Sequence, residues 1–236
     1  MSTFSLLTAL REVALIDWLA LAWFVAVWWG YASFARRPRT TDASLLATTN
    51  RHRREWMMQT TIRENRVIDG LVVQALSTSP SFFASTTILI IGGLLAVLGS
   101  DHAPALVKEI PFAARTSALV FDLKLLVLTA VFVYAFFRFT WSMRQYTFGA
   151  LLIASAPDHL AFQRGEASRD EFADRAAKVV GLAAETFNDG LRAYYMAFAA
   201  ILWFFSPIAF ALGAGGVAYL LYQREFRSEI LDALRH

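Results

Sequence analysis

The sequence predicts an all-α, polytopic membrane protein with four transmembrane helices and helical cytoplasmic extensions. The 236 residues are 57% apolar, with a mean hydropathy of +0.45, whereas soluble domains are usually about 45–50% apolar. The charged residues gather between four long windows that contain almost none. The chain has no cysteine, which excludes disulfides, thiolate metal sites and cysteine nucleophiles.

The four windows predict membrane spans at residues 17–35, 80–98, 118–137 and 193–222. A bilayer core of roughly 30 Å is crossed by about 20 residues of helix. Strands of a membrane barrel would be about 10 residues long with alternating polarity, but these windows are longer and apolar on every face. We therefore expect helices. The first window does not resemble a cleaved signal peptide, because its basic residues follow it rather than precede it.

Two of the connecting segments also have the period of a helix. Apolar side chains recur about every 3.6 residues in residues 42–78 and in residues 168–192, which predicts amphipathic cytoplasmic helices. Ser168 and Glu171 match a capping box at the start of the second segment. With no linker or separate soluble domain, residues 1–236 are expected to form a single membrane domain.

The distribution of basic residues predicts the orientation in a cell (inner) membrane. Residues 36–66 hold eight arginines and residues 138–192 hold seven basic residues, whereas residues 99–115 hold only two. Because loops rich in arginine and lysine stay in the cytoplasm, the first and third loops are expected inside and both termini outside. The three arginines after residue 222 oppose this. A fourth span broken at Ser206–Pro207 would return the tail to the cytoplasm, and this alternative stays open.

Asp122 is the main candidate for an intramembrane polar site, since an ionisable side chain within a span is costly and is by default a functional hypothesis. The alternative is that Asp122 is partly hydrated while Lys124 extends its amine to the interface. The full candidate site consists of Asp122, Lys124, Arg115, Thr86 and Thr87.

A second candidate is a collar of charged side chains at the predicted cytoplasmic ends of the spans, all expected at similar depth. It could bind an anion or a lipid headgroup, or its members could pair with one another. The collar residues are Arg63, Arg66, Asp69, Arg138, Arg144, Asp189 and Arg192. The basic run from Arg51 to Arg54 predicts contact with anionic lipids of the inner leaflet, and nucleic acid is not expected.

No catalytic residue, metal site or cofactor is predicted. All four histidines lie outside the apolar windows, so a haem held between membrane helices is not expected. The sequence contains no GxxxxGK, HExxH or GxSxG motif.

Five segments resemble a family known from bacteria and plants as domain of unknown function 599. The segments are RENRVIDG at 63–70, SFFASTTILIIGGLLAVLG at 81–99, KLLVLTAVFVYAFFRFTWSMRQYTFGALL from Lys124, FNDGLRAYYMAFAAILWFFSP at 187–207 and LYQREFRS at 221–228. The resemblance implies a four-helix integral membrane protein. It implies no activity, cofactor or residue role.

Three functions follow as hypotheses. The first is a self-associating membrane scaffold or accessory subunit, supported by the long amphipathic segments and the lack of catalytic motifs. The second is an oligomeric channel or transporter for ions or small solutes. The third is a lipid-binding or lipid-acting protein of the inner leaflet. The expected partners are therefore the lipid bilayer, anionic inner-leaflet lipids and a second copy of the chain.

Overall fold

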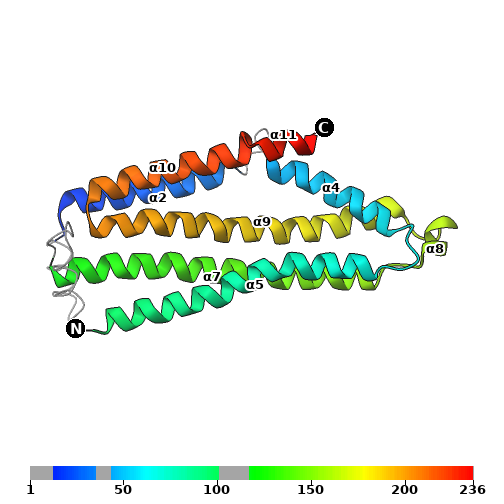
Figure 1. Cartoon of the computed structure of the whole chain (residues 1–236), viewed down its shortest axis with the longest axis horizontal. Coiled ribbons are helices and arrows are strands. Elements are labelled where there is room, and N and C mark those ends of the chain that lie inside the picture. Colours follow the sequence, from blue (N-terminus) through cyan, green and yellow to red (C-terminus); the bar gives the residue numbers. More distant parts are fainter. Residues whose placement is uncertain (1–12, 36–43, 101–116, 236) are drawn as a thin grey trace. The chain divides into compact units, whose positions relative to one another are not determined.

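The computed structural model describes residues 13–35, 44–100 and 117–235. All the secondary structure in these ranges is helical (Figure 1), which confirms the all-α prediction. In chain order the elements are α2 (Leu15–Ala35), α4 (Leu45–Thr60), α5 (Val67–Leu98), α7 (Ala118–Ala154), α8 (His159–Gln163), α9 (Arg169–Ile201), a short 3₁₀ helix η1 (Leu202–Phe204), α10 (Pro207–Phe226) and α11 (Glu229–Arg235).

Among the described residues, three helices are long and apolar enough to cross a membrane: α2, α5 and α7. They contain the first three predicted spans. Both α5 and α7 extend well beyond those windows, with 32 and 37 residues. At 1.5 Å per residue these helices are about 48 and 56 Å long, longer than a hydrocarbon core of roughly 30 Å.

The fourth predicted window, residues 193–222, is not one helix, and that prediction is wrong. Helix α9 ends at Ile201 and α10 begins at Pro207, whose ring lacks an N–H and would clash with the preceding helical turn. A Cβ atom on Gly213 would lie 3.6 Å from the Ala199 Cα, although fourteen residues of straight helix span about 21 Å. The chain therefore reverses through η1, and α10 runs back alongside α2 (Figure 1).

The predicted helical segment 42–78 is also divided, because α4 ends at Thr60 and α5 begins at Val67. Asn65 starts the second helix, since its Oδ1 accepts a hydrogen bond from the Val67 amide at 2.9 Å. The predicted start of the segment 168–192 is confirmed: the Ser168 hydroxyl accepts from the Glu171 amide at 3.3 Å.

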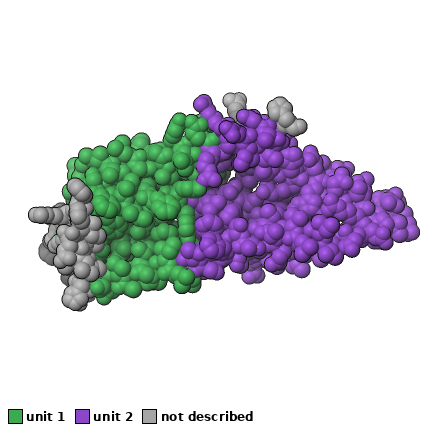
Figure 2. Space-filling view, viewed as in Figure 1, with its two compact units in different colours: residues 1–37, 87–134, 192–223 green, residues 38–86, 135–191, 224–236 purple. Residues whose placement is uncertain are grey.

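The chain divides into two compact units, drawn in green and purple in Figure 2. Unit 1 comprises Met1–Arg37, Thr87–Tyr134 and Arg192–Gln223, and unit 2 comprises Pro38–Thr86, Ala135–Leu191 and Arg224–His236. The core of unit 1 is largely aromatic. The Trp203 ring stacks on Phe210 with centroids 4.8 Å apart, and Phe210 lies 4.9 Å from Phe24.

The core of unit 2 is built on small side chains of α9. Ala173, Ala176 and Ala183 are fully buried and pack in one cluster with Met57 and Tyr146. A small-residue face lets neighbouring helices approach closely, because nothing bulky separates their backbones.

The C-terminal helix α11 belongs to unit 2, where it contacts α4. Leu231 is only 1% exposed, and a His52 ring nitrogen lies 3.1 Å from the Leu234 carbonyl oxygen. The predicted orientation put residues 36–66 inside and the C-terminus outside. Groups in hydrogen-bond contact cannot lie on opposite faces of a bilayer, so that combination is wrong. The contact fits the alternative that the sequence left open, in which the fourth window breaks at Ser206–Pro207 and the tail returns to the side of residues 36–66.

Candidate functional site

A buried polar cluster in unit 1 joins α2, α7 and η1. Asp17 lies in the first turn of α2, Lys124 lies on α7, and Trp203 lies in η1. The Trp203 indole N–H donates to the Asp17 carboxylate at 2.6 Å. The Lys124 ammonium lies 3.6 Å from the same carboxylate oxygen and donates to the Trp203 carbonyl at 2.9 Å.

Both charges of this cluster are removed from solvent. The Lys124 side chain is 1% exposed and that of Asp17 is 9% exposed. The lysine also lies over the Trp203 ring, 5.5 Å from its centroid, where the aromatic face attracts a cation. A buried charge is tolerated only when it is paired and hydrogen-bonded. The cluster satisfies this requirement, and it fixes the turn of the α9–α10 hairpin to two other helices.

The predicted intramembrane site is only partly assembled. Lys124 does not extend to an interface as the sequence suggested but is almost completely buried. Asp122 is half-buried and makes no ion pair or hydrogen bond with any described residue. Arg115 lies outside the described residues. The site's polar centre is therefore Lys124 with Asp17, rather than Asp122.

The two threonines of the predicted site behave differently. Thr86 is half-buried and its hydroxyl donates to the Phe82 carbonyl of the same helix at 2.9 Å. Thr87 is fully buried, and its hydroxyl is hydrogen-bonded to that of Tyr194 at 2.7 Å. Thr87 thus links α5 to α9, whereas the hydroxyl of Thr86 is hydrogen-bonded, among the described residues, only within its own helix.

Asp69 is the centre of a second buried cluster, which lies in unit 2. It is fully buried in the first turn of α5. Its Oδ1 accepts from the Trp56 indole at 2.6 Å, from the Thr60 hydroxyl at 3.1 Å, and from the Arg63 guanidinium. Its Oδ2 has no partner among the described residues. The cluster ties the end of α4 to the start of α5.

Arg66 holds the same corner to the loop that follows α7. Its guanidinium donates to the carbonyl oxygens of Thr60 at 3.2 Å, Ala156 at 3.0 Å and Pro157 at 2.5 Å. All three acceptors belong to the backbone and carry no net charge. The bonds therefore hold the corner and the loop together and do not neutralise the guanidinium. With three carbonyls bound, Arg66 has few donors left for a phosphate or carboxylate ligand.

Arg138 and Asp189 form an ion pair between α7 and α9 in unit 2. Next to the pair, a Cβ atom at Gly190 would lie 2.5 Å from the Phe139 ring, so only glycine permits this approach of the two helices. Ser142 strengthens the contact by donating to the Ala183 carbonyl at 2.7 Å.

The predicted collar is not a single ring. Phe83 stacks on Phe139, beside Arg138, with centroids 5.2 Å apart. Asp69 lies fourteen residues before Phe83 on α5, which is about 21 Å of helix. The pairs Arg63–Asp69 and Arg138–Asp189 therefore lie at two separate levels of unit 2.

The two remaining collar residues each contact an aromatic ring. In unit 2, the Arg144 guanidinium lies 5.8 Å from the centroid of Phe148. In unit 1, that of Arg192 lies 5.6 Å from the centroid of Tyr31, and Arg192 is only 6% exposed. Such contacts suit a guanidinium that lies along an apolar surface.

The basic run on α4 is largely engaged within unit 2. Arg53 donates to Thr49 and Asn50 at 3.0 and 2.7 Å, and burial lowers the pKa of Arg53. Arg54 donates to Asp174 at 2.5 Å and to Asp170 at 2.8 Å. Of the arginines in this run, only Arg54 is thus paired with carboxylates in the described part of the chain, whereas Arg51 and Arg53 bond to uncharged side chains, and contact of this run with anionic lipids stays a prediction.

Sequence reasoning missed Asp17 and Trp203 as members of a buried site. Asp17 is the first residue of the first predicted span, and a charged residue at the end of a span is common. Trp203 looked like one more apolar residue of a continuous span. The available signal was Pro207, because a break there brings the residues before it into a turn. In the described ranges, no group of three or more histidine, aspartate or glutamate side chains could hold a metal ion.

Comparisons with known proteins give the family of the chain and no activity. No curated protein and no solved structure matches the chain. The family model described as "Protein of unknown function, DUF599" matches residues 19–230, which is nearly the whole sequence and includes most of the clusters above. The chain therefore belongs to this family, as the five resembling segments had indicated.

Proposed function

We propose that the protein is a self-associating membrane scaffold in which α5 is the contact between copies. The observation that carries this proposal is the low burial of α5. Only 11% of its most apolar window is buried within the chain, compared with 22% for α2 and 50% for α7. Of the three apolar helices, α5 thus has the largest share of surface left for lipid or for another chain.

The residue types on α5 favour another chain over lipid. Ser85 and Gly92 are exposed and lie seven residues apart, hence on one face. A Cβ atom at Gly92 would meet nothing within 4 Å. Small residues let membrane helices approach closely, and a serine hydroxyl can bond across such a contact, whereas lipid chains offer it no partner.

The first turns of α5 support the same proposal. Val67, Ile68 and Leu71 are 62–67% exposed. They precede Pro80 by nine to thirteen residues, which is about 14–20 Å of helix. If lipid surrounds the predicted span 80–98, these apolar side chains lie beyond the hydrocarbon core. A second copy would cover them, as expected for contiguous exposed apolar surface.

Disulfide cross-linking tests this function directly, because the natural chain has no cysteine. Ser85→Cys is placed in the proposed contact, and Leu212→Cys, which is 72% exposed on α10, is the matched control. Residues near a two-fold axis meet their own copies, so mild oxidation in membranes should yield dimers of Ser85→Cys alone. Equal cross-linking of both variants, or of neither, would defeat the proposal.

We further infer the orientation of the scaffold. Residues 36–66 and 138–192 lie in the cytoplasm of a cell (inner) membrane, together with the C-terminus, and the N-terminus lies outside. The contact of α11 with α4 and the number of arginines and lysines in all three segments support this assignment, because the rule counts basic residues and not net charge. With Arg51→Cys, Ile230→Cys and Ser100→Cys, a membrane-impermeant maleimide should label only Ser100→Cys in intact cells. Labelling of Ile230→Cys from outside would refute it.

A channel or transporter is the second candidate, and the Asp17–Lys124 pair favours it, because ion pairs among apolar helices often mark ion pathways. Its test is ion flux into liposomes carrying the purified protein. Transport through this site should be lost in Lys124→Met and kept in Asp122→Asn.

The lipid-binding hypothesis receives less support, since Arg66 and Arg192 are already engaged by carbonyl oxygens and an aromatic ring.

A further inference from the structure

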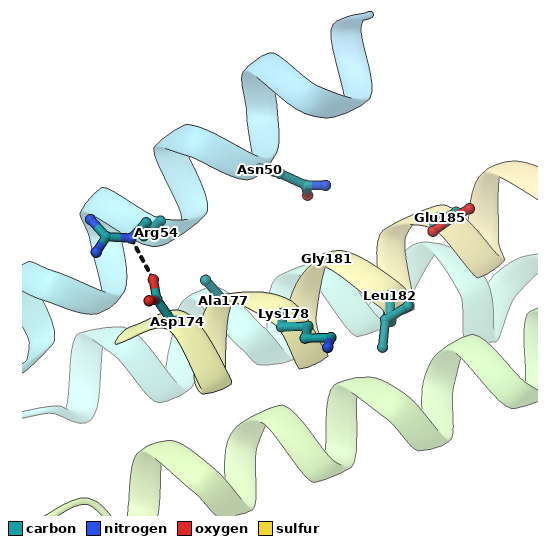
Figure 3. A pocket seen from close by; sticks show the side chains of 8 residues that line it. All are labelled: Asn50, Arg54, Asp174, Ala177, Lys178, Gly181, Leu182 and Glu185. Carbon is teal, nitrogen blue, oxygen red and sulfur yellow. Dashed lines mark hydrogen bonds and ion pairs between the residues drawn. The ribbon is translucent and has the colours of Figure 1, made fainter. Parts of the chain in front are cut away.

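A shallow, open cleft with a volume of ≈ 270 Å³ lies between α4 and α9 of unit 2, and charged and amide side chains line it together with apolar surface (Figure 3). Ligand sites for drug-sized molecules usually have about 300–1,000 Å³, so this cleft has room for a small metabolite. The scaffold function makes no use of it, and no membrane span lines it.

The floor of the cleft is kept free of side chains by Gly181. A Cβ atom there would lie 2.9 Å from the Asn50 Oδ1, so any other residue would push the Asn50 amide out of place. In Figure 3, Asn50 projects from α4 across the gap toward Gly181. The close approach of this amide to the α9 backbone therefore depends on glycine.

One end of the cleft is closed by Arg54 and two carboxylates, which together leave one negative charge in excess. Arg54 donates to Asp174 at 2.5 Å and to Asp170 at 2.8 Å, as the dashed line to Asp174 in Figure 3 indicates. With both carboxylates bound, this guanidinium is not the group that a ligand would meet. The remaining polar groups decide the chemistry of the cleft.

Two hydrogen-bond donors in the middle of the cleft are unused. The Asn50 Oδ1 accepts from Arg53 at 2.7 Å, which leaves its amide N–H groups without a partner among the described residues. The Lys178 ammonium likewise has no ion pair or hydrogen bond in this part of the chain. Both residues line the cleft; in Figure 3 the Lys178 side chain lies along α9 and away from Asn50, so a rotamer change of this flexible side chain is needed to bring the two donors onto one phosphate or carboxylate.

Glu185 supplies an acceptor of opposite charge at the other end. It lies seven residues after Lys178, about 10 Å along α9 and on the same face. No described residue pairs with its carboxylate. Leu182 separates the two charges along the wall.

We propose that the cleft binds a small phosphate–ammonium zwitterion, with the anion at Lys178 and Asn50 and the ammonium at Glu185. A lone anion would be repelled by Glu185, and a lone cation by Lys178, so a molecule carrying both charges fits best. The same chemistry is offered by a free metabolite and by an ethanolamine lipid headgroup. Glu185 precedes the charge-free window from Ala193 by eight residues, about 12 Å of helix. Because the cleft is thus set apart from the predicted span, we favour the free metabolite over the lipid headgroup.

Calorimetric titration of the purified full chain in detergent with phosphoethanolamine tests the proposal. Saturable binding is expected, and Lys178→Gln and Glu185→Gln should each weaken it about tenfold or more. Gly181→Ala should weaken it by displacing Asn50. Arg175→Gln and Glu171→Gln are the matched controls, because both residues are exposed on α9 outside the cleft, and they should bind as the natural chain does.

The proposal would be overturned by the lack of saturable binding to the natural chain, or by equal binding by all five variants. Inorganic phosphate that binds as tightly as phosphoethanolamine would also overturn it, since the ammonium would then contribute nothing. In nanodiscs, loss of free-ligand binding with phosphatidylethanolamine but not with phosphatidylglycerol would identify the headgroup as the source. Cross-linking through Ser85→Cys should persist in every cleft variant, which separates this test from that of self-association.

Discussion

The two units contain the same polar arrangement in different surroundings. In unit 1, Asp17 accepts from the Trp203 indole at 2.6 Å and pairs with Lys124. In unit 2, Asp69 accepts from the Trp56 indole at 2.6 Å and pairs with Arg63.

Both aspartates lie in the first turn of a helix, where the helix dipole favours a negative charge. The difference is the exposure of the cation, 1% for the Lys124 side chain and 40% for that of Arg63. Near water a cation can lose its partner and be hydrated, whereas a fully buried one cannot.

The largest expected effect is in unit 1. Asp17→Ala leaves the Lys124 ammonium buried without its counter-ion, and should lower the free energy of unfolding by about 3–5 kcal/mol. Asp17→Asn combined with Lys124→Met should cost far less, because no unpaired charge remains. Unfolding in mixed SDS micelles measures both, with Asp122→Asn as a control expected within about 0.5 kcal/mol of the natural chain. Equal losses in the single and double variants would refute the explanation.

Asp69→Ala should cost less, about 1–3 kcal/mol, although it removes three hydrogen bonds. Arg63 regains water, so the penalty comes from the buried Trp56 and Thr60 donors that lose their acceptor. The same unfolding measurement gives the ranking. Asp69→Asn, which keeps an acceptor for Trp56, should recover part of the loss. If Asp69→Ala proved as harmful as Asp17→Ala, exposure of the cation would not be the deciding factor.

Two glycines sharpen the comparison of helix packing. A Cβ atom at Gly190 in unit 2 would lie 2.5–2.9 Å from the Phe139 ring, whereas one at Gly213 in unit 1 would meet the flexible end of Leu202 at 2.6 Å. Gly190→Ala should cost about 1–3 kcal/mol and Gly213→Ala clearly less, since a leucine can change rotamer. Gly70→Ala, in open space, should be neutral or stabilising by up to about 1 kcal/mol. Thermal unfolding would show this order or contradict it.

The smallest effect is a pH dependence at the contact of α11 with α4. A hydrogen bond to the Leu234 carbonyl, then the bond to Glu55, raises the pKa of His52, while Arg51 opposes this weakly. Only the imidazolium can donate to both acceptors at once. Because the pKa is raised in the folded state, the stabilisation is complete below about pH 6.5, the ordinary histidine value, and is lost as pH rises through the raised pKa.

Spin labels at Arg51→Cys and Ile230→Cys should therefore report a closer and narrower distance distribution at pH 5.5 than at pH 8.5. His52→Gln should remove most of this pH dependence, because a glutamine does not titrate. A distribution that changes equally in the natural chain and in His52→Gln would assign the effect to another group.

Hydropathy predicted the helical class and the first three apolar segments because a bilayer imposes long charge-free windows. It failed at residues 202–206, where composition does not change. Only Pro207 and the following glycines distinguish a tight turn there from a continuous span. Local chemistry was more reliable at polar ends, as Ser168 shows: its capping bond depends on neighbouring residues alone.

The polar sites were less predictable, because they depend on which helices meet. Arg63 and Asp69 lie six residues apart, and their pairing was within reach of sequence reasoning. Asp17, Lys124 and Trp203 are separated by 79 residues or more, and only the fold brings them together. Lys124 was therefore expected to seek the interface, whereas the tertiary structure provides it with a buried carboxylate.

The reversal at η1 also bears on how the chain enters a membrane. Its turn, LWFFS, carries no charge, so if the end of α9 and α10 lie in a bilayer, the turn between them enters it without moving an ion across the hydrocarbon. The connection at residues 99–115 carries Asp101, Lys108 and Glu109 and would need a translocation machinery to cross. In that case the turn at η1 makes no such demand, and the two connections differ in what they require of the cell.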